Sequence, residues 1–418
     1  MGSSLYAAVA DGSDVRVTRL RVGGPPVRPA EDPAPPARNH GSCARTRGVV
    51  LITAATLLVL GACNPVEPAT PAGGPQPTPR VWQQPIVSGL SQPWDLAFLP
   101  VEPHTMVFTE KAGDISVWRD GQRQLLHHPA GIVSQGEGGL MGITVDPNWV
   151  TNRFLYVCMM TASDVRVVRL QTNAAFTSVV DRDDIVTGIP RSTGRHSGCR
   201  VGFQSSNSGL WITTGDAAQG TNPQDLSSLG GKVLRVNRQG APRADNPDLG
   251  GDPRIYTYGH RNPQGLAFRP GTNQAFSVEH GSNRDDEVNR LVPGANYGWD
   301  PVPGYNETVP MTDLVKFPSA REAIWSSGFP TIAPSGATFL SGEQWKGWNG
   351  ALAVAVLKDR HIRIMFPTGD GNDISFDHEV MREYDTRLRS VVQGPDGFLY
   401  ITTDVGSGGG AIWRLIPT

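Results

Sequence analysis

Residues 389–404 read RSVVQGPDGFLYITTD, and residues 410–417 read GAIWRLIP. An apolar run leads into a Gly-Pro-Asp-Gly turn, a second apolar run ends in two threonines, and a third run follows a glycine-rich loop. Short runs of this composition, separated by Gly, Pro and Asp, are typical of antiparallel strands joined by tight turns. The glycines of residues 406–410 lie between two such strands, so they indicate a hairpin loop and not a nucleotide-binding turn.

The same pattern returns along the chain, and its copies begin near Trp94, Met141, Arg200, Gln264, Ser335 and Arg389. Blade-sized repeats run to about 40–50 residues, so the wider spacings here predict insertions, for example at residues 245–252 and 305–327. Six such units predict an all-β fold, a six-bladed β-propeller with four-stranded antiparallel blades, over residues 81–418. A two-sheet sandwich is the alternative, but it does not explain self-similar units.

The composition agrees with a turn-rich fold and limits the partners. The 418 residues include 49 Gly and 35 Pro, and 37 basic residues stand against 39 acidic ones, for a net charge of −2. A nucleic-acid surface needs a concentrated basic field, which this balance does not provide. Small molecules or proteins are therefore the expected partners.

The N-terminal region reads as a targeting segment. Arg45 and Arg47 precede an apolar run at residues 49–62, which ends in Leu-Gly-Ala before Cys63. This run is shorter than the about 20 residues that span a bilayer, and a basic flank with a short apolar core predicts a signal peptide. The ending resembles a bacterial lipoprotein box with Cys63 as the acylated residue, although a plain signal peptide or a buried strand would also fit.

These features divide the chain into an extension and lipoprotein-type signal at residues 1–62, a Pro/Ala/Thr-rich tether at 63–80, and the propeller. The expected location is the cell envelope, either lipid-anchored on the outer face of the membrane or periplasmic. Membrane contact is expected only through the N-terminal lipid. Export would leave Cys158 and Cys199 in an oxidising compartment, where a disulfide and two buried thiols are both open alternatives. No Cys-x-x-Cys metal motif occurs.

Polar residues stand just before most of the repeats. Glu137 precedes the second repeat, His196 the third, Arg261 the fourth, Thr331 the fifth and Arg387 the sixth. In a propeller the loops before the innermost strands meet around the axis, so these side chains are expected to converge at one mouth of the channel.

From about Gln92 onward the chain resembles the soluble quinoprotein glucose dehydrogenase and aldose sugar dehydrogenase family, which uses pyrroloquinoline quinone (PQQ). The resemblance rests on eight ordered motifs: GEGGL at 136–140, GRHSGCR at 194–200, YGHRNPQG at 258–265, HGSNRDDE at 280–287, NYGW at 296–299, PTIAPS at 330–335, LK at 357–358 and RLR at 387–389.

The resemblance implies a role for each matching position. The implied catalytic residues are His196, as the general base, and Arg261. The implied cofactor-binding residues are Glu137, Arg261, Asn262, Thr331, Lys358, Arg387 and Arg389. Main-chain carbonyls of Gly281 and Ser282 would hold a calcium ion beside the cofactor, and Glu287 and Tyr297 match a second, structural calcium. Asp286 and His280 fall on the substrate side.

The chain also departs from the family pattern. Glu137 and His280 stand where glutamine is common, Ser282 replaces a proline and Arg195 an aspartate, and Phe329 stands where the glucose enzymes have tryptophan. These changes concern mostly the sugar side of the site, so they leave open which sugar is used.

The chemistry of these residue types agrees with the resemblance. Lysine and arginine match the three carboxylates of PQQ, calcium prefers oxygen ligands, and neutral histidine accepts a proton near neutral pH. The expected activity is oxidation of an aldose at C1 to the lactone, by hydride transfer to PQQ, with a quinone, cytochrome or dye as the final electron acceptor. A non-enzymatic propeller that binds sugar or protein is the alternative, and a metal-dependent hydrolase would need carboxylates spread over several blades.

Overall fold

The computed structural model describes residues 78–100, 105–205 and 207–418. The expected signal peptide, Cys63 and most of the tether lie outside the described residues. Within the described part of the chain, no helix combines the length and the apolar character that crossing a membrane requires.

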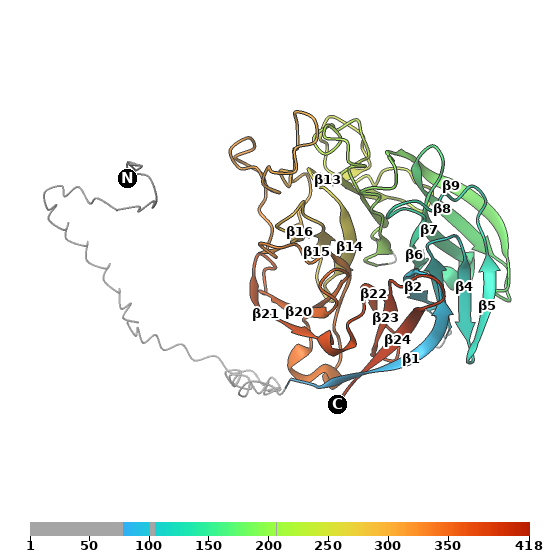
Figure 1. The fold of residues 1–418 in the computed structure, drawn as a ribbon. Coiled ribbons are helices and arrows are strands. Elements are labelled where there is room, and N and C mark those ends of the chain that lie inside the picture. Colours follow the sequence, from blue (N-terminus) through green and yellow to red (C-terminus); the bar gives the residue numbers. More distant parts are fainter. Residues whose placement is uncertain (1–77, 101–104, 206) are drawn as a thin grey trace, which may run out of the picture. The chain divides into compact units, whose positions relative to one another are not determined.

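Six four-stranded antiparallel sheets form the blades of a propeller, which confirms the predicted fold (Figure 1). Blade 1 consists of β2 (Pro93–Phe98), β3 (Met106–Glu110), β4 (Ile115–Arg119) and β5 (Gln122–His127). Blade 2 consists of β6 (Leu140–Val145), β7 (Phe154–Met160), β8 (Val165–Thr172) and β9 (Val179–Ile189). Blade 3 consists of β10 (Val201–Phe203), β11 (Leu210–Thr214), β12 (Lys232–Val236) and β13 (Ile255–Tyr258).

The second half of the chain repeats this order. Blade 4 consists of β14 (Pro263–Phe268), β15 (Ala275–Glu279), β16 (Glu287–Leu291) and β17 (Trp325–Ser326). Blade 5 consists of β18 (Pro334–Phe339), β19 (Leu352–Val356), β20 (Ile362–Pro367) and β21 (Ile374–Val380). Blade 6 consists of β22 (Leu388–Gln393), β23 (Leu399–Thr403), β24 (Gly410–Pro417) and, from the other end of the chain, β1 (Val81–Leu90). The described helices are the short α1 (Trp149–Asn152) and the 3-10 turns Glu343–Trp348 and Arg382–Tyr384.

The innermost strands form a ring around the channel. Strand β2 packs against β6 and β22, β18 packs against β14 and β22, β6 contacts β10, and β11 contacts β14. Each repeat found in the sequence begins within one residue of an innermost strand, so the loops before these strands meet at one end of the channel. The ring closes where β1 pairs antiparallel with β24, from Val81 opposite Pro417 to Leu90 opposite Gly410.

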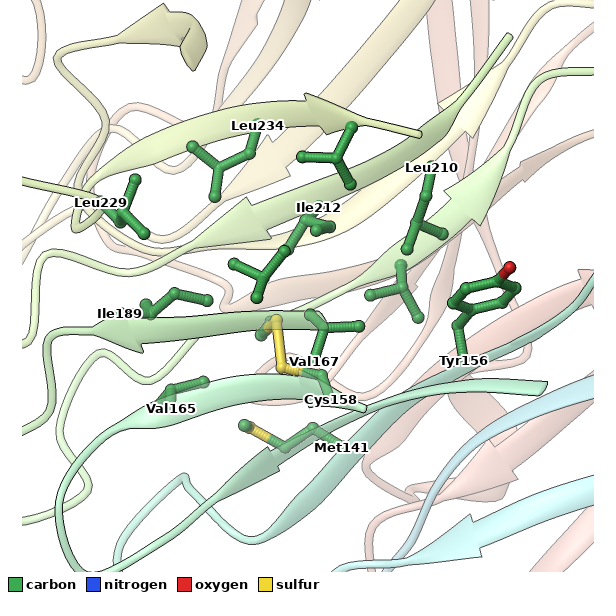
Figure 2. Close-up of a cluster of buried hydrophobic side chains, with 14 of the residues drawn as sticks. Met141, Tyr156, Cys158, Val165, Val167, Ile189, Leu210, Ile212, Leu229 and Leu234 are labelled. Atoms are coloured by element: carbon green, nitrogen blue, oxygen red, sulfur yellow. A yellow bond between two sulfur atoms is a disulfide. The ribbon is translucent and has the colours of Figure 1, made fainter. Parts of the chain in front are cut away.

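The core lies between blades because both faces of a blade are covered by its neighbours. Inner strand β7 is buried along nearly its whole length, whereas the outer strand β9 is largely exposed. Figure 2 shows one such interface, in which Tyr156 and Val167 of blade 2 face Leu210 and Ile212 of blade 3.

A disulfide crosses the interface between blades 2 and 3. Cys158 of β7 is bonded to Cys199, which lies in the loop before β10. The structure therefore decides between the two alternatives that the sequence left open. The bond fixes the loop that also carries His196.

Candidate active site

A cavity of about 260 Å³ opens where the loops before the innermost strands meet. Its lining consists of Glu137, Arg195, His196, Arg261, His280, Gly281, Ser282, Asp286, Glu307, Thr331 and Ala333. Four of the five polar groups expected to converge, Glu137, His196, Arg261 and Thr331, line this cavity, whereas Arg387 does not. A larger cavity of about 720 Å³ lies at the opposite ends of the same strands, but none of the predicted site residues lines it.

His196 is oriented by a buried carboxylate that the sequence analysis missed. Its Nδ1 lies 2.8 Å from Oδ1 of Asp216, which follows β11 and is fully buried. The Tyr305 hydroxyl and the Trp299 indole donate to the other oxygen of Asp216, at 2.6 and 2.9 Å. A carboxylate that accepts the Nδ1 proton leaves Nε2 as the ring nitrogen that can take up a proton, which is the arrangement of a general base.

A signal for Asp216 exists in the repeats. An acidic residue ends or follows the second strand of several blades, namely Glu110, Asp216, Glu279 and Asp404. Three of these carboxylates bind groups of the site: Asp216 binds His196, Glu279 binds the Arg261 amide, and Asp404 binds Arg387 and Arg389. Comparing the ends of the second strands, in addition to the starts of the first strands, would have found them.

Arg261 reaches the cavity from the loop before β14. Its guanidinium donates to the main-chain oxygen of His280 at 3.1 Å and to Oε1 of Glu307 at 2.6 Å. The same Glu307 oxygen accepts a hydrogen bond from Arg195 at 2.6 Å. Glu307 belongs to the long loop between β16 and β17, and sequence reasoning gave it no role.

Glu137 and Asn262 are directly bonded, and their network continues to blade 6. The Asn262 amide donates to Glu137 at 2.8 Å, and Gln264 donates to the same oxygen at 3.0 Å. Arg389 then donates to Gln264 at 2.5 Å and to Asp404 at 2.9 Å. Burial alone would raise the pKa of Glu137, but His280, His196 and the hydrogen bond from Asn262 outweigh it and lower the pKa, so this carboxyl is anionic.

The other predicted cofactor cations, Lys358, Arg387 and Arg389, are not among the residues that line the cavity. Lys358 donates to the Thr331 hydroxyl at 2.9 Å, and Thr331 itself lines the cavity. Arg387 pairs with Asp404 at 3.2 Å, the acid that also binds Arg389.

Lys111 is a further cation of this region that the sequence analysis missed. Its Nζ donates to the main-chain oxygen of Gly136 at 2.8 Å. Burial lowers its pKa, while Asp404 and Glu137 oppose that change and Arg389 adds to it.

Gly281 and Ser282 form a tight loop at the cavity wall. A Cβ on Gly281 would lie 2.0 Å from the main-chain oxygen of Arg284, so only glycine fits this turn. Asp286 holds the loop, because its fully buried carboxylate accepts the Gly281 amide at 2.8 Å and the amides of Ile332 and Ala333 at 2.5 and 2.8 Å. Both oxygens of Asp286 thus serve loop geometry, and the expected substrate contact of this residue stays a prediction.

Glu287 lies directly opposite Glu279 on adjacent strands and is buried with it. Burial and the Glu279 carboxylate raise the pKa of Glu287 well above its ordinary value. Asn289 donates to both acids, at 2.7 Å to Glu279 and 3.1 Å to Glu287.

Tyr297 stacks on His260 and donates its hydroxyl to a main-chain oxygen, so its phenol is already bonded.

Three buried nitrogen atoms near the cavity lack a hydrogen-bond partner among the residues that the structure describes. They are Nε of Arg261, Nε of Arg389 and Nε2 of His280. Buried polar groups are almost always paired, so these atoms indicate a missing polar ligand. The nearby cations and the unpaired guanidinium donors fit an anionic, oxygen-rich group such as PQQ, and the paired carboxylates and the glycine loop fit a hard cation such as calcium.

Fold and cavity together define a propeller enzyme with a histidine–aspartate pair and converging arginines at one mouth of its channel. The chain belongs to the Glucose / Sorbosone dehydrogenase family, whose model matches residues 90–414, and it is an oxidoreductase of that family.

Similar proteins agree with this membership. The chain is 32% identical over 340 residues to the aldose sugar dehydrogenase YliI of Escherichia coli, which covers 76% of this chain and 89% of that protein. It is 28% identical over 354 residues to quinoprotein glucose dehydrogenase B of Acinetobacter calcoaceticus, over 65% and 74% of the two chains. The PQQ-bound structure of an aldose sugar dehydrogenase from Streptomyces coelicolor matches with a TM-score of 0.68 and 26% identity, over 82% of this chain and 100% of that one. The resemblance expected from the motifs is confirmed.

Proposed function

We propose that this protein oxidises an aldose sugar at C1 to the lactone, with PQQ and calcium bound at the 260 Å³ cavity. The observation that carries the proposal is the pairing of His196 Nδ1 with the fully buried Asp216, beside three unpaired buried nitrogen atoms. The PQQ-bound state of a relative from Streptomyces coelicolor supports the choice of cofactor.

His196 receives the proton of the C1 hydroxyl on Nε2, while Asp216 keeps the ring in place and stabilises the imidazolium that forms. When bound, PQQ supplies the acceptor for the hydride from C1, and calcium beside it acts as a Lewis acid. Loss of the hydroxyl proton and of the hydride removes two electrons from the sugar and leaves the lactone. Arg261, whose guanidinium is buried and fixed by two acceptors, provides positive charge where negative charge develops.

The residues that would hold the cofactor come from several blades, and Glu137, Arg261 and Thr331 among them line the cavity. Arg261 and Asn262 come from the loop before β14, and Thr331 with Lys358 comes from blade 5. Arg387 and Arg389 come from blade 6, and Glu137 orders Asn262 across the channel. Main-chain carbonyls of Gly281 and Ser282 are the proposed calcium ligands, with Glu287 and Tyr297 at a second calcium. Electrons leave by a quinone, a cytochrome or an artificial dye.

We also propose that the protein is exported and lipid-anchored through Cys63. The Cys158–Cys199 disulfide supports export, since such bonds persist in oxidising compartments. Metabolic labelling with a radioactive fatty acid tests the anchor, because Cys63→Ser should lose the label while the wild-type protein carries it.

The enzymatic proposal is tested by reconstituting the protein with PQQ and calcium, then screening aldoses with a dye acceptor. His196→Ala should bind PQQ but reduce it with sugar about 10²–10⁴-fold more slowly than wild type. The matched control is His128→Ala, which changes an exposed histidine of blade 1. If no aldose reduces the PQQ bound to the wild-type protein, the non-enzymatic alternative replaces this proposal.

A further inference from the structure

One carboxylate at the cavity rim is held by two arginines from different blades. Oε1 of Glu307 accepts hydrogen bonds from Arg195 and from Arg261, each at 2.6 Å. Arg195 precedes the proposed base His196 in the sequence, and Arg261 is the proposed electrophilic residue. The Glu307 carboxylate therefore links Arg261 to the arginine that precedes the proposed base, and it lines the same cavity.

The loop that carries Glu307 is tied to the His196–Asp216 pair. Tyr305, two residues before Glu307, donates its hydroxyl to Asp216 at 2.6 Å, and that hydroxyl lies 2.9 Å from His196 Nδ1. The backbone N–H of Asn306 donates to the main-chain oxygen of Pro301 at 2.7 Å, which closes the turn formed by residues 301–306. Glu307 is thus held in a fixed position relative to the proposed base.

Half of this carboxylate is available to a ligand. Both of its hydrogen bonds end on Oε1, and among the described residues Oε2 has no partner. The Glu307 side chain is 38% exposed and that of Arg195 is 45% exposed. Burial alone would raise the pKa of Glu307, but Arg195 and Arg261 outweigh it and lower the pKa. The rim therefore offers a charged acceptor oxygen beside the remaining N–H donors of Arg195.

An acceptor and a donor side by side match two neighbouring hydroxyl groups, each of which can donate and accept. A carboxylate carried by the sugar would meet the anionic side chains of Glu307 and Glu137. The positive charge of Arg195 would not offset this repulsion, because Arg195 is already paired with Glu307. Like charges at short range oppose binding, which is how a site rejects a wrong ligand.

We propose that Glu307 and Arg195 form a specificity subsite that binds adjacent hydroxyls of a neutral aldose and excludes sugars with a carboxylate. The inference rests on the proposed function and names the substrate class of that site. Glu307 is a specificity-determining residue that also helps to fix Arg261, and it moves neither the proton nor the hydride.

The test compares Glu307→Ala and Glu307→Gln with wild type on two pairs of sugars that differ at C6, D-glucose with D-glucuronate and D-galactose with D-galacturonate. Glu307→Ala should raise KM for the neutral sugar about tenfold, the loss expected for one charged hydrogen bond, and change kcat less than KM. Because this variant leaves Arg195 and Arg261 without their anion, kcat/KM for the uronate relative to the neutral sugar should rise. Glu307→Gln keeps an acceptor oxygen without the charge, so its KM and its uronate ratio should lie between those of wild type and Glu307→Ala.

Two further measurements, one with a sugar analogue that cannot be oxidised at C1 and one with a control variant, distinguish a loss of sugar binding from misfolding and from a loss of the oxidation itself. The inhibition constant of 1,5-anhydro-D-glucitol, which lacks the C1 hydroxyl and cannot be oxidised there, should rise with KM. The control Glu322→Ala changes an exposed acid of the same loop and should leave KM, kcat and the sugar ratio unchanged.

A folded Glu307→Ala variant with wild-type KM, inhibition constant and uronate ratio would overturn the subsite while leaving the proposed oxidation intact. Equal losses on neutral and acidic sugars would also overturn it, because they would reveal a structural role only. A wild-type protein that binds PQQ and oxidises none of the four sugars would count against both this inference and the proposed function. Oxidation of the uronates in preference to the neutral sugars by wild type would reverse the assigned substrate class.

Discussion

Replacing Asp216 with asparagine tests the proposed base without touching it. The carboxylate accepts hydrogen bonds from His196 and the Ala218 amide on Oδ1, at 2.8 and 2.7 Å, and from Tyr305 and Trp299 on Oδ2. An amide has only one acceptor oxygen, so its NH₂ group must face one of these two sets of donors. Neither the Ala218 amide nor the Trp299 indole can reverse its role.

The orientation with NH₂ toward His196 moves the ring proton to Nε2, where it blocks proton uptake. The other orientation keeps the tautomer but breaks the bond to Trp299, and in both cases the imidazolium loses its negative partner. We therefore expect sugar oxidation by Asp216→Asn to slow by about 10²–10⁴-fold, which corresponds to about 3–5 kcal/mol of activation free energy. Asp216 does not line the cavity, so PQQ affinity should stay near that of wild type.

The assay is stopped-flow reduction of bound PQQ after mixing with an oxidisable aldose, at matched cofactor occupancy and with folding checked by circular dichroism. Asp225→Asn, which changes an exposed acid of the same loop, is the control and should react like wild type. A well-folded Asp216→Asn protein that reduces PQQ within about threefold of the wild-type rate would show that the tautomer of His196 does not matter, and the assignment of His196 as the base would fail.

Three other perturbations have defined outcomes. Lys358→Ala removes the donor behind Thr331, so it should weaken PQQ binding by about 1.5–3 kcal/mol and regain activity at high PQQ; unchanged affinity in a PQQ titration would remove this lysine from the cofactor site. Calcium at about 100 times its dissociation constant should raise the free energy of unfolding by about 2.7 kcal/mol and tighten PQQ binding. Chelation should reverse both effects. A melting temperature that is insensitive to calcium would refute the ligands assigned at Gly281 and Ser282. Cys158→Ala with Cys199→Ala should lower the free energy of unfolding by about 4 kcal/mol, as expected for a bond that spans 41 residues, whereas a denaturation midpoint equal to that of wild type would show that the bond does not stabilise the ring.

The sequence predicted the fold well because the propeller is a repetition. Each copy carries the same alternation of strand and turn, and the copy that begins at Arg389 lies within one residue of β22. That copy shows only three strands in the sequence, and the fourth strand of its blade comes from β1 at the other end of the chain. Such a pairing leaves no local signal, since it depends on closure of the whole ring.

The candidate site could be predicted where its residues stand at repeat boundaries or in motifs. His196, Arg261 and Thr331 line one cavity because the ends of the innermost strands meet, and this geometry follows from the fold. Glu307 lies in an insertion between β16 and β17, whose path depends on contacts made far away in the sequence. No sequence pattern in residues 305–327 predicts that the Glu307 carboxylate binds two arginines.

Asp286 shows a different limit of sequence reasoning. The family resemblance implied a substrate-side role for it, and it does line the cavity. Its two oxygens are nevertheless directed at the main-chain amides of Gly281, Ile332 and Ala333. Residue type indicates that a carboxylate needs partners, but only the folded chain decides whether these are ligands or backbone.

The pairing of β1 with β24 sets the order of events in biosynthesis. Arg80 and Thr418, which are 338 residues apart in the sequence, meet where the first and last strands of the propeller pair. A ribosome must therefore release almost the entire polypeptide before the ring can close. Until then β1 and β23 lack their common partner β24, and their unpaired backbone groups are exposed to other chains. Arg387 and Arg389 belong to this last blade, so a chain that lacks β24 would carry these two arginines on a sheet that has not closed.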